Sequence, residues 1–373
     1  MCSVTNTRRH VPLCGKFDDR TEVSWVDNPS VVDMDRLTTW MDENGIGTGP
    51  VTDVVELAGG TQNILIRFSR GGQDLVFRRP PLHKRKNSDE TMRREAVVLA
   101  GLANSDVPHP RLIASCDDHD VLECQFFIME AVTGFTATSE VPDDLVNSLD
   151  HQHALGLSMI DALAALGRVD PDTAGVSSLG RADGWLERQV PKWRKQLDSY
   201  AELEGWPGSA ALPDIDKLGA WLQSNVPTDW QPGLIHGDFH FGNVMFRLDA
   251  PKVAAIIDWE LATIGDPLLD LGHLLATWPN ETERRTVGLA KSLPGLPTRD
   301  ELIAQYSQGS ARDLSNVDWY QALACYRLGI LLEGTYARSC AGKAAADVGE
   351  RLHRTAESLI EQGLSIVLSH TVR

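Results

Sequence analysis

The chain has 373 residues and is 42% hydrophobic, which suits one large or two modest domains with a sizeable core. Its 52 Asp and Glu residues against 35 Lys and Arg residues give a formal net charge of −17. Neutralising phosphates requires an excess of Lys and Arg, so we expect no nucleic-acid partner and no binding to anionic membranes. No apolar run reaches about 18 residues, so no transmembrane helix is predicted.

The six cysteines form no CxxC pair and show no zinc-site spacing. We therefore interpret them as reduced thiols of a cytoplasmic protein. The polar N-terminus lacks the apolar core of a signal peptide. Nothing in the composition indicates an oligomeric state.

The first 50 residues predict an arm and one helix. Residues 1–30 have little periodicity and are expected to form an extended or loosely docked arm. Residues 31–43 place Val32, Leu37, Trp40 and Met41 on one helical face. The glycine-rich run at 45–50 follows a helix rather than a strand, so it is not a dinucleotide-binding loop.

Residues 51–79 alternate strand-like runs with turns, and Gly71-Gly72 marks a tight hairpin. The loop between the first two strands carries Gly60, Thr61 and Asn63. Backbone N–H groups without bulky side chains can approach phosphates closely, although a plain hairpin turn would explain the same residues. The basic stretch that includes Lys84–Lys86 is either a solvated loop or a landing patch for anionic groups.

Downstream, residues 107–132 predict strands that end near Glu130 and Val132, and the pattern becomes helical from about residue 145. Residues 298–370 predict three or four helices. The stretch 317–340 is nearly apolar all round in its middle, so it is expected to be buried. Its tyrosines and Glu333 either pack in the core or line a cleft.

Residues 234–272 hold the densest polar pattern. A polar turn between two short apolar runs carries His236, Asp238, His240 and Asn243, and a further apolar run ends abruptly in Asp258. An acidic group at the end of an apolar strand needs a partner such as a metal or a hydrogen-bond donor. Phosphoryl transfer uses one carboxylate to hold the attacking hydroxyl and oxygen ligands to hold Mg²⁺, and this spacing supplies both.

The segment HGDFHFGN at 236–243, followed by IDWE at 257–260, resembles the aminoglycoside phosphotransferase family, a branch of the protein-kinase-like fold. The Trp-Glu pair and the GDPLLDL run at 265–271 are most similar to kinase-like domains associated with acyl-CoA dehydrogenases. The resemblance implies an α+β, two-lobed fold: a mainly antiparallel β N-lobe at 31–132 and a helical C-lobe at 133–373.

The resemblance also implies roles for the central residues. Asp238 is the expected catalytic base or positioner of the acceptor hydroxyl, with Asn243 and Asp258 as Mg²⁺ ligands. His240 either donates to the transferring phosphate or only shapes the loop. Two residues are expected to give structural support: His236 braces the turn, and Asp270 hydrogen-bonds the loop backbone.

For the nucleotide, ATP or GTP, the resemblance implies that Gly60, Thr61 and Asn63 cover the phosphates. Arg78 stands where kinases place a phosphate-binding lysine, and Glu95 is its expected orienting partner. The main chain of Glu130 and Val132 is expected to meet the adenine edge.

The leading hypothesis is an ATP- and Mg²⁺-dependent kinase that phosphorylates the hydroxyl of a small molecule. The acceptor is expected to be a metabolic hydroxyl compound such as a hydroxyacyl-CoA, or an aminoglycoside-like antibiotic. Glu260 and Asp266 could meet a cationic acceptor or a structural partner. Two alternatives are a non-catalytic kinase-like nucleotide-binding module, suggested by Arg78 in place of lysine, and a metal-dependent phosphoesterase that uses His236 and His240 as ligands.

Overall fold

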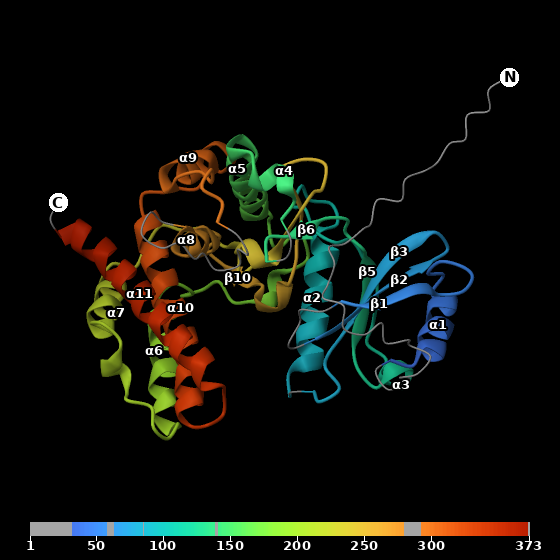
Figure 1. Ribbon diagram of the computed structural model, residues 1–373, viewed down its shortest axis with the longest axis horizontal. Helices are drawn as coiled ribbons and strands as arrows, with labels where there is room; N and C mark the ends of the chain where they lie inside the picture. Colours follow the sequence, from blue (N-terminus) through green and yellow to red (C-terminus); the bar gives the residue numbers. More distant parts are fainter. Residues whose placement is uncertain (1–31, 58–62, 85, 139–140, 280–291, 372–373) are drawn as a thin grey trace.

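The computed structural model describes residues 32–57, 63–84, 86–138, 141–279 and 292–371. The expected arm at 1–30 and the loop residues Gly60 and Thr61 lie outside these ranges. Within them the chain forms a sheet-bearing N-terminal part and a mainly helical C-terminal part (Figure 1).

Five antiparallel strands form the N-terminal sheet, in the order β1-β2-β3-β5-β4. Gly71 and Gly72 join β2 to β3 with φ angles of 58° and 77°, and Arg70 pairs with Gln73 across the turn. Positive φ at both central residues matches the strand twist and favours glycine, so the predicted tight hairpin is confirmed. The strands are β1 Thr52–Glu56, β2 Ile64–Arg70, β3 Gln73–Arg79, β4 Leu112–Cys116 and β5 Phe126–Glu130.

Three helices, α1 Met34–Glu43, α2 Ser88–Leu102 and α3 His119–Leu122, accompany this sheet. The side chain of Asp33 caps α1 by accepting from the Arg36 N–H at 3.0 Å. The buried face of α1 is the predicted one, and its Trp40 ring packs edge-on against Phe126 of β5. Helix α1 therefore closes a separate small core on this sheet.

The C-terminal part contains two small sheets that carry the central polar segment. Strand β7 (Gly233–Ile235) pairs with β10 (Thr263–Gly265), and β8 (Val244–Phe246) lies between β6 (Phe135–Thr136) and β9 (Val253–Ile256). The surrounding helices are α4 Asp143–Val146, α5 Leu149–Gly167, α6 Gln189–Asp198, α7 Ile215–Ser224, α8 Leu268–Thr277, α9 Arg299–Gly309, α10 Val317–Cys340 and α11 Ala346–Thr371. None of the helices in the described ranges is both long and apolar enough to span a membrane.

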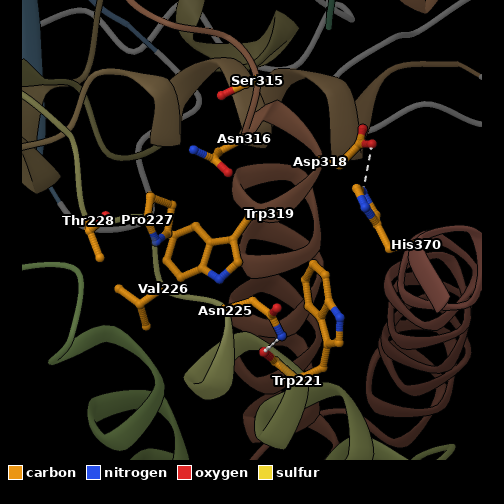
Figure 2. A pocket seen from close by; sticks show the side chains of 10 residues that line it. All are labelled: Trp221, Asn225, Val226, Pro227, Thr228, Ser315, Asn316, Asp318, Trp319 and His370. Atoms are coloured by element: carbon orange, nitrogen blue, oxygen red, sulfur yellow. Dashed lines mark hydrogen bonds and ion pairs between the residues drawn. The ribbon is translucent and has the colours of Figure 1, made fainter. Parts of the chain in front are cut away.

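A cavity of about 280 Å³ lies where α7, α10 and α11 meet (Figure 2). The indoles of Trp221 and Trp319 form part of its wall, and His370 Nε2 lies 3.0 Å from Asp318 Oδ2 at its edge. None of the predicted site residues lines it. This cavity is therefore separate from the polar segment at 236–258.

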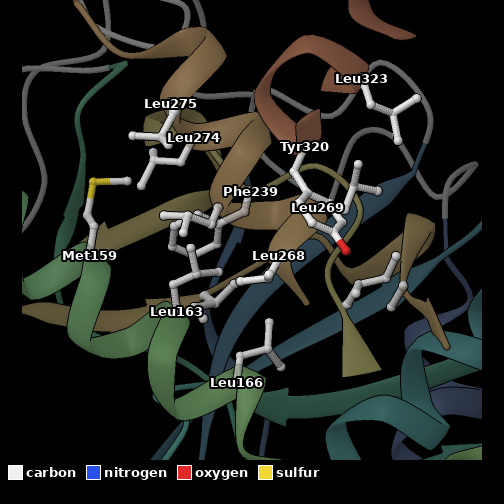
Figure 3. Close-up of a cluster of buried hydrophobic side chains, with 14 of the residues drawn as sticks. Met159, Leu163, Leu166, Phe239, Leu268, Leu269, Leu274, Leu275, Tyr320 and Leu323 are labelled. Carbon is white, nitrogen blue, oxygen red and sulfur yellow. The ribbon is translucent and has the colours of Figure 1, made fainter. Parts of the chain in front are cut away.

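The main core is built by α5, α8 and α10 around Phe239 (Figure 3). Helices α8 and α10 approach so closely that a Cβ on Gly272 would lie 2.5 Å from the Tyr320 carbonyl carbon. Helix α10 is buried through its middle, as predicted, and Glu333 is buried with Tyr320 and Tyr326. Core packing is thus the correct interpretation of these three residues, whereas Tyr336 is only partly buried and stacks on the His353 ring.

The Gly272 contact yields a stability prediction. Replacing Gly272 with Ala should lower the free energy of unfolding by about 2 kcal/mol, because overpacking against a backbone exceeds the roughly 1 kcal/mol that Ala gains in helix propensity. Urea unfolding measures the change. The matched control is Gly219→Ala in α7, where the added Cβ would meet only the Tyr326 side chain, at 3.2 Å. Equal stability of the two variants would contradict the proposed close crossing.

Candidate functional site

The loop from 236 to 243 joins β7 to β8, and we call it the β7–β8 loop. It leaves β7 at Gly237, whose φ is 85° and where a Cβ would lie 2.6 Å from the Leu261 carbonyl oxygen. Both the positive φ and the close backbone exclude a larger residue. The loop then closes with a short 3₁₀ turn at Phe241–Asn243 that leads directly into β8.

Asp270 of α8 anchors this loop from beneath. Its Oδ2 accepts from the His236 N–H at 2.6 Å, and its Oδ1 accepts from the Gly237 N–H at 2.9 Å. The side chain is completely buried. One carboxylate therefore satisfies two consecutive backbone donors that the tight turn would otherwise leave without partners.

His236 ties the loop to the end of β9. Its Nε2 lies 2.9 Å from the Ile257 carbonyl oxygen, and its Nδ1 accepts from the Asp238 N–H at 3.2 Å. Both ring nitrogens are therefore engaged, which fixes the tautomer with hydrogen on Nε2. A histidine in this state has no free nitrogen for a metal.

Asp238, Asn243 and His240 form one hydrogen-bonded group. Asn243 Nδ2 donates to the Asp238 main-chain oxygen at 2.9 Å and to Oδ2 at 3.1 Å. His240 Nδ1 accepts from the Gly242 N–H at 2.9 Å, which leaves hydrogen on Nε2, and Nε2 lies 3.5 Å from Asp238 Oδ2. Burial opposes ionisation of Asp238, but the hydrogen bond from His240 and the adjacent histidines hold its pKa well below its usual range.

Two buried residues beside Asp238 were missed by the sequence analysis. His273 of α8 is fully buried, and its Nε2 lies 3.4 Å from Asp238 Oδ1. Arg327 of α10, also buried, donates through Nη2 to the Gly237 carbonyl oxygen. The signal was present: each is a polar residue inside a helical stretch that is otherwise almost wholly apolar.

Arg78 links the N-terminal sheet to the end of β9. Its Nη2 donates to Glu95 Oε1 at 3.0 Å and to Asp258 Oδ1 at 2.9 Å. The expected contact between Arg78 and Glu95 is therefore present, and Asp258 joins it. Burial raises the pKa of Glu95 to about 7 against the opposing charge of Arg78.

Asp258 sits beside Asn243 through the strand pairing. The Ile257 N–H donates to the Asn243 main-chain oxygen at 2.9 Å. Asp258 has a φ of 65°, an uncommon value for a non-glycine residue, and its side chain is 39% exposed. Left-handed backbone at such a position is typical of functional sites and turns the side chain out of the strand.

One group of potential metal ligands is present in the described part of the chain. It consists of Glu95, Asp258 and Glu260, whose carboxylate oxygens lie within 4.8 Å of one another. His236 and His240 are not in that group. The phosphoesterase alternative, which requires histidine ligands, thus loses its support. Asp266 is buried and accepts from the Tyr320 hydroxyl at 2.6 Å, so it has a structural partner rather than a cationic acceptor.

The expected nucleotide-facing residues are only partly described. Asn63 immediately precedes β2, whereas Gly60 and Thr61 lie outside the described ranges. The Glu130 N–H is already used, because it donates to the Arg111 carbonyl oxygen at 2.9 Å. The Val132 N–H has no partner among the described residues. Of the two N–H groups, only that of Val132 can meet an adenine edge.

In the basic stretch, Lys84 already has hydrogen-bond partners within the protein. Lys84 Nζ lies 3.1 Å from Asp89 Oδ2 and donates to the Glu123 carbonyl oxygen at 2.6 Å. Arg85 lies outside the described ranges. These contacts favour a local structural role for Lys84 at the start of α2.

Comparisons with known proteins identify the family. A model of the phosphotransferase enzyme family APH matches residues 53–320. The acyl-CoA dehydrogenase family member 11 of Gallus gallus is 29% identical over 322 residues, which cover 84% of this chain and 40% of that protein. The chain thus spans less than half the length of this curated relative.

Solved structures have the same fold. A Ralstonia eutropha protein provisionally described as an aminoglycoside phosphotransferase is 26% identical, with a TM-score of 0.76 over 91% of this chain and 99% of that one. A thermostable aminoglycoside phosphotransferase APH(4)-Ia, in complex with AMP-PNP and hygromycin B, is 16% identical, with a TM-score of 0.58 over 87% of this chain and 98% of that one. The expected kinase-like α+β fold is confirmed, and the chain belongs to the APH phosphotransferase enzyme family.

Proposed function

We propose that this protein transfers the γ-phosphoryl group of ATP to a hydroxyl of a small molecule. The observation that supports this most strongly is the group formed by Asp238 and Asn243, with Asp258 brought alongside by the Ile257–Asn243 backbone hydrogen bond. The Asp238 carboxylate is partly exposed and is hydrogen-bonded to Asn243, and Asp258 directly follows the residue whose N–H bonds to the Asn243 main chain. In-line phosphoryl transfer uses these residue types to orient the attacking hydroxyl and to hold the metal.

In the proposed reaction Asp238 accepts the proton of the acceptor hydroxyl. The alcohol oxygen forms a bond to the γ-phosphorus, the bond between that phosphorus and the β–γ bridging oxygen breaks, and ADP leaves with the electron pair. The low pKa of Asp238 keeps it ionised, so its main contribution is to orient the hydroxyl, with proton transfer late. Asn243 and His240 hold one carboxylate oxygen, and His273 faces the other.

The residues present fit a magnesium ion. Asn243 uses its amide N–H groups on Asp238, so its amide oxygen has no donor from the described residues and is available as a neutral ligand. Asp258 supplies an anionic oxygen. Hard oxygen ligands from two side chains, with water and phosphates, satisfy Mg²⁺. The ion, when bound, would neutralise charge on the nucleotide phosphates.

Arg78 has two roles in this proposal. It is the candidate cation for the phosphates, and its bond to Asp258 holds that carboxylate until a nucleotide and metal arrive. Guanidinium groups bind phosphate well, so the replacement of lysine is compatible with activity. The same bond also supports the alternative, a kinase-like module that binds nucleotide without turnover, and measured transfer separates the two.

Support for ATP comes from the complex of the related phosphotransferase with AMP-PNP. For the acceptor, we favour a metabolic hydroxyl compound over an aminoglycoside. Asp266, one of the two acidic groups considered for a cationic antibiotic, is buried and already accepts a hydrogen bond from Tyr320. The acyl-CoA dehydrogenase names of the curated relatives are consistent with a hydroxyacyl-CoA or a related metabolite.

Replacing Asp238 with Asn should reduce phosphoryl transfer by about 100-fold or more while leaving nucleotide affinity within about threefold, because Asn keeps the shape but loses the negative charge that orients the hydroxyl. Phosphate transfer over a panel of hydroxyl compounds and calorimetric titration with AMP-PNP measure the two effects. Turnover at the wild-type rate in the variant would remove Asp238 from the proposed role.

Replacing Asp258 with Ala should weaken nucleotide binding about tenfold or more in the presence of Mg²⁺ and have little effect in its absence. Calorimetric titrations with and without the metal give the difference. Asp249→Ala is the control, since Asp249 is an exposed carboxylate between β8 and β9 that pairs only with Arg247. An equal loss with and without metal would show that Asp258 is not a ligand.

His273 predicts how stability depends on pH. Burial lowers the pKa of His273 to about 3, from 6.5 for an ordinary histidine, although Asp238 opposes the shift. Protons therefore bind preferentially to the unfolded chain, and stability that is complete above about pH 6.5 falls as the pH drops toward 3. The free energy of unfolding changes by roughly 1.4 kcal/mol per pH unit for one such group, so His273 should lower it by about 2 kcal/mol between about pH 6.5 and about pH 5.

Denaturant unfolding at several pH values should show that the free energy of unfolding falls less with decreasing pH in His273→Asn than in the wild-type protein. The exposed His151 of α5 provides the control variant, His151→Asn, which should keep the wild-type profile. Parallel profiles for all three proteins would mean that His273 is not buried in its neutral form.

A further inference from the structure

Two cations and an indole lie together beside the β7–β8 loop. Trp193 of α6 is the centre of the group: the Arg327 guanidinium carbon lies 5.4 Å from its ring centroid, and Lys192 Nζ lies 5.1 Å from it. Arg327 also donates to the Gly237 carbonyl oxygen. The group thus begins one residue from Asp238, although it comes from α6 and α10.

The positive charge of this group is balanced only in part by nearby carboxylates. The Lys192 ammonium makes no hydrogen bond or ion pair with the part of the chain that the structure describes; it lies over the Trp193 ring. Asp238 and Asp270 are the carboxylates that interact electrostatically with Arg327. Asp270 already accepts hydrogen bonds from two backbone N–H groups of the β7–β8 loop. Burial and the charge of Arg327 lower the pKa of Lys192. In a chain with a net charge of −17, a lysine next to a buried arginine and without a carboxylate partner among the described residues is unexpected.

The same group contains hydrogen-bond donors without acceptors. Trp193 Nε1 and Arg327 Nη1 are buried, and neither has a partner among the described residues. The two residues are only 8% and 6% exposed. A buried donor without a partner costs about 1–3 kcal/mol, so a set of them next to a reaction centre indicates a missing acceptor.

We propose that Lys192, Trp193 and Arg327 form an anion subsite for the phosphoryl acceptor, so that the acceptor is an alcohol that also carries a carboxylate or a phosphate. This inference rests on the proposed function and deepens it by naming the acceptor class. Lys192 is exposed, so in this proposal it meets the anion first. Binding to the two buried donors would then require the flexible Lys192 side chain to move aside.

The chemistry favours an anion over the cation of an aminoglycoside. A carboxylate or phosphate gains charge-assisted hydrogen bonds from both side-chain cations, whereas an ammonium would be repelled by them. Asp238 is itself an anion and repels an anionic acceptor, so a nearby positive charge is needed to offset that repulsion. Arg327 supplies that charge, because it lies against the backbone of the residue before Asp238.

The test uses matched acceptors that differ in charge. Wild-type protein with Mg²⁺ and ATP is offered 3-hydroxybutyrate and its amide, glycerol 3-phosphate and glycerol, and choline and kanamycin, with ADP formation followed. Thermal shift with Mg²⁺ and AMP-PNP follows binding of the same compounds, independently of turnover. We expect an anionic member of a pair to bind and react in preference to its neutral partner, and the two anionic arms distinguish carboxylate from phosphate.

Lys192→Glu should raise the KM for the preferred anionic acceptor at least tenfold with a smaller change in kcat, and Lys192→Arg should restore it. Lys195→Glu, an exposed lysine of the same helix, is the matched control and should behave as the wild-type protein. Thermal unfolding of each variant verifies that the exposed substitutions leave the fold intact.

Equal binding of charged and neutral partners, preference for choline or kanamycin, binding of none of the anions, or equal effects of Lys192→Glu and Lys195→Glu would each overturn the subsite. Those outcomes leave the proposed function standing if AMP-PNP still binds in a manner that depends on Mg²⁺ and Asp258. Failure of that nucleotide binding would instead overturn the proposed function.

Discussion

The two hydrogen bonds that the Asp270 carboxylate accepts from His236 and Gly237 are the constraint on which the site depends. They fix the backbone where the chain turns through a positive φ at Gly237, and so fix where Asp238 points. Asp270 is placed by α8, and α8 is placed by its close crossing with α10 at Gly272. A packing contact between two helices therefore helps to determine the position of the Asp238 carboxylate on the loop.

Charge in the site is arranged in two layers that meet at the β7–β8 loop. On the side of the N-terminal sheet, Arg78 joins Glu95 and Asp258. On the helical side, Arg327 and His273 lie under Gly237 and Asp238. In the proposal, the group around Arg78 binds the phosphates and the metal, and the group around Arg327 binds and orients the hydroxyl compound. A low dielectric makes both sets of interactions stronger than they would be in water.

Much of the fold and of the site could be predicted from sequence because the decisive signals are local. The Gly71-Gly72 hairpin, the buried face of α1 and the spacing of Asp238 and Asn243 need only neighbouring residues. The contact between Arg78 and Glu95 could be proposed from the family pattern. His273 and Arg327 could not be assigned, because their function depends on which helix packs beneath which loop, and helical periodicity does not encode that. The available sequence signal was that each is a polar residue within an otherwise apolar helix, which indicates a buried polar contact.

In the proposed complex, Asn243 and Asp258 hold a metal on a nucleotide whose terminal phosphate faces Asp238. The most direct measurement is a crystal structure of the protein with AMP-PNP and Mg²⁺. We expect a metal ion bound by the Asn243 amide oxygen and the Asp258 carboxylate, the terminal phosphate turned toward Asp238, and Arg78 moved from Asp258 to a phosphate. A bound nucleotide whose metal touches neither side chain, or an unbroken bond between Arg78 and Asp258 in the presence of metal, would contradict the proposed complex.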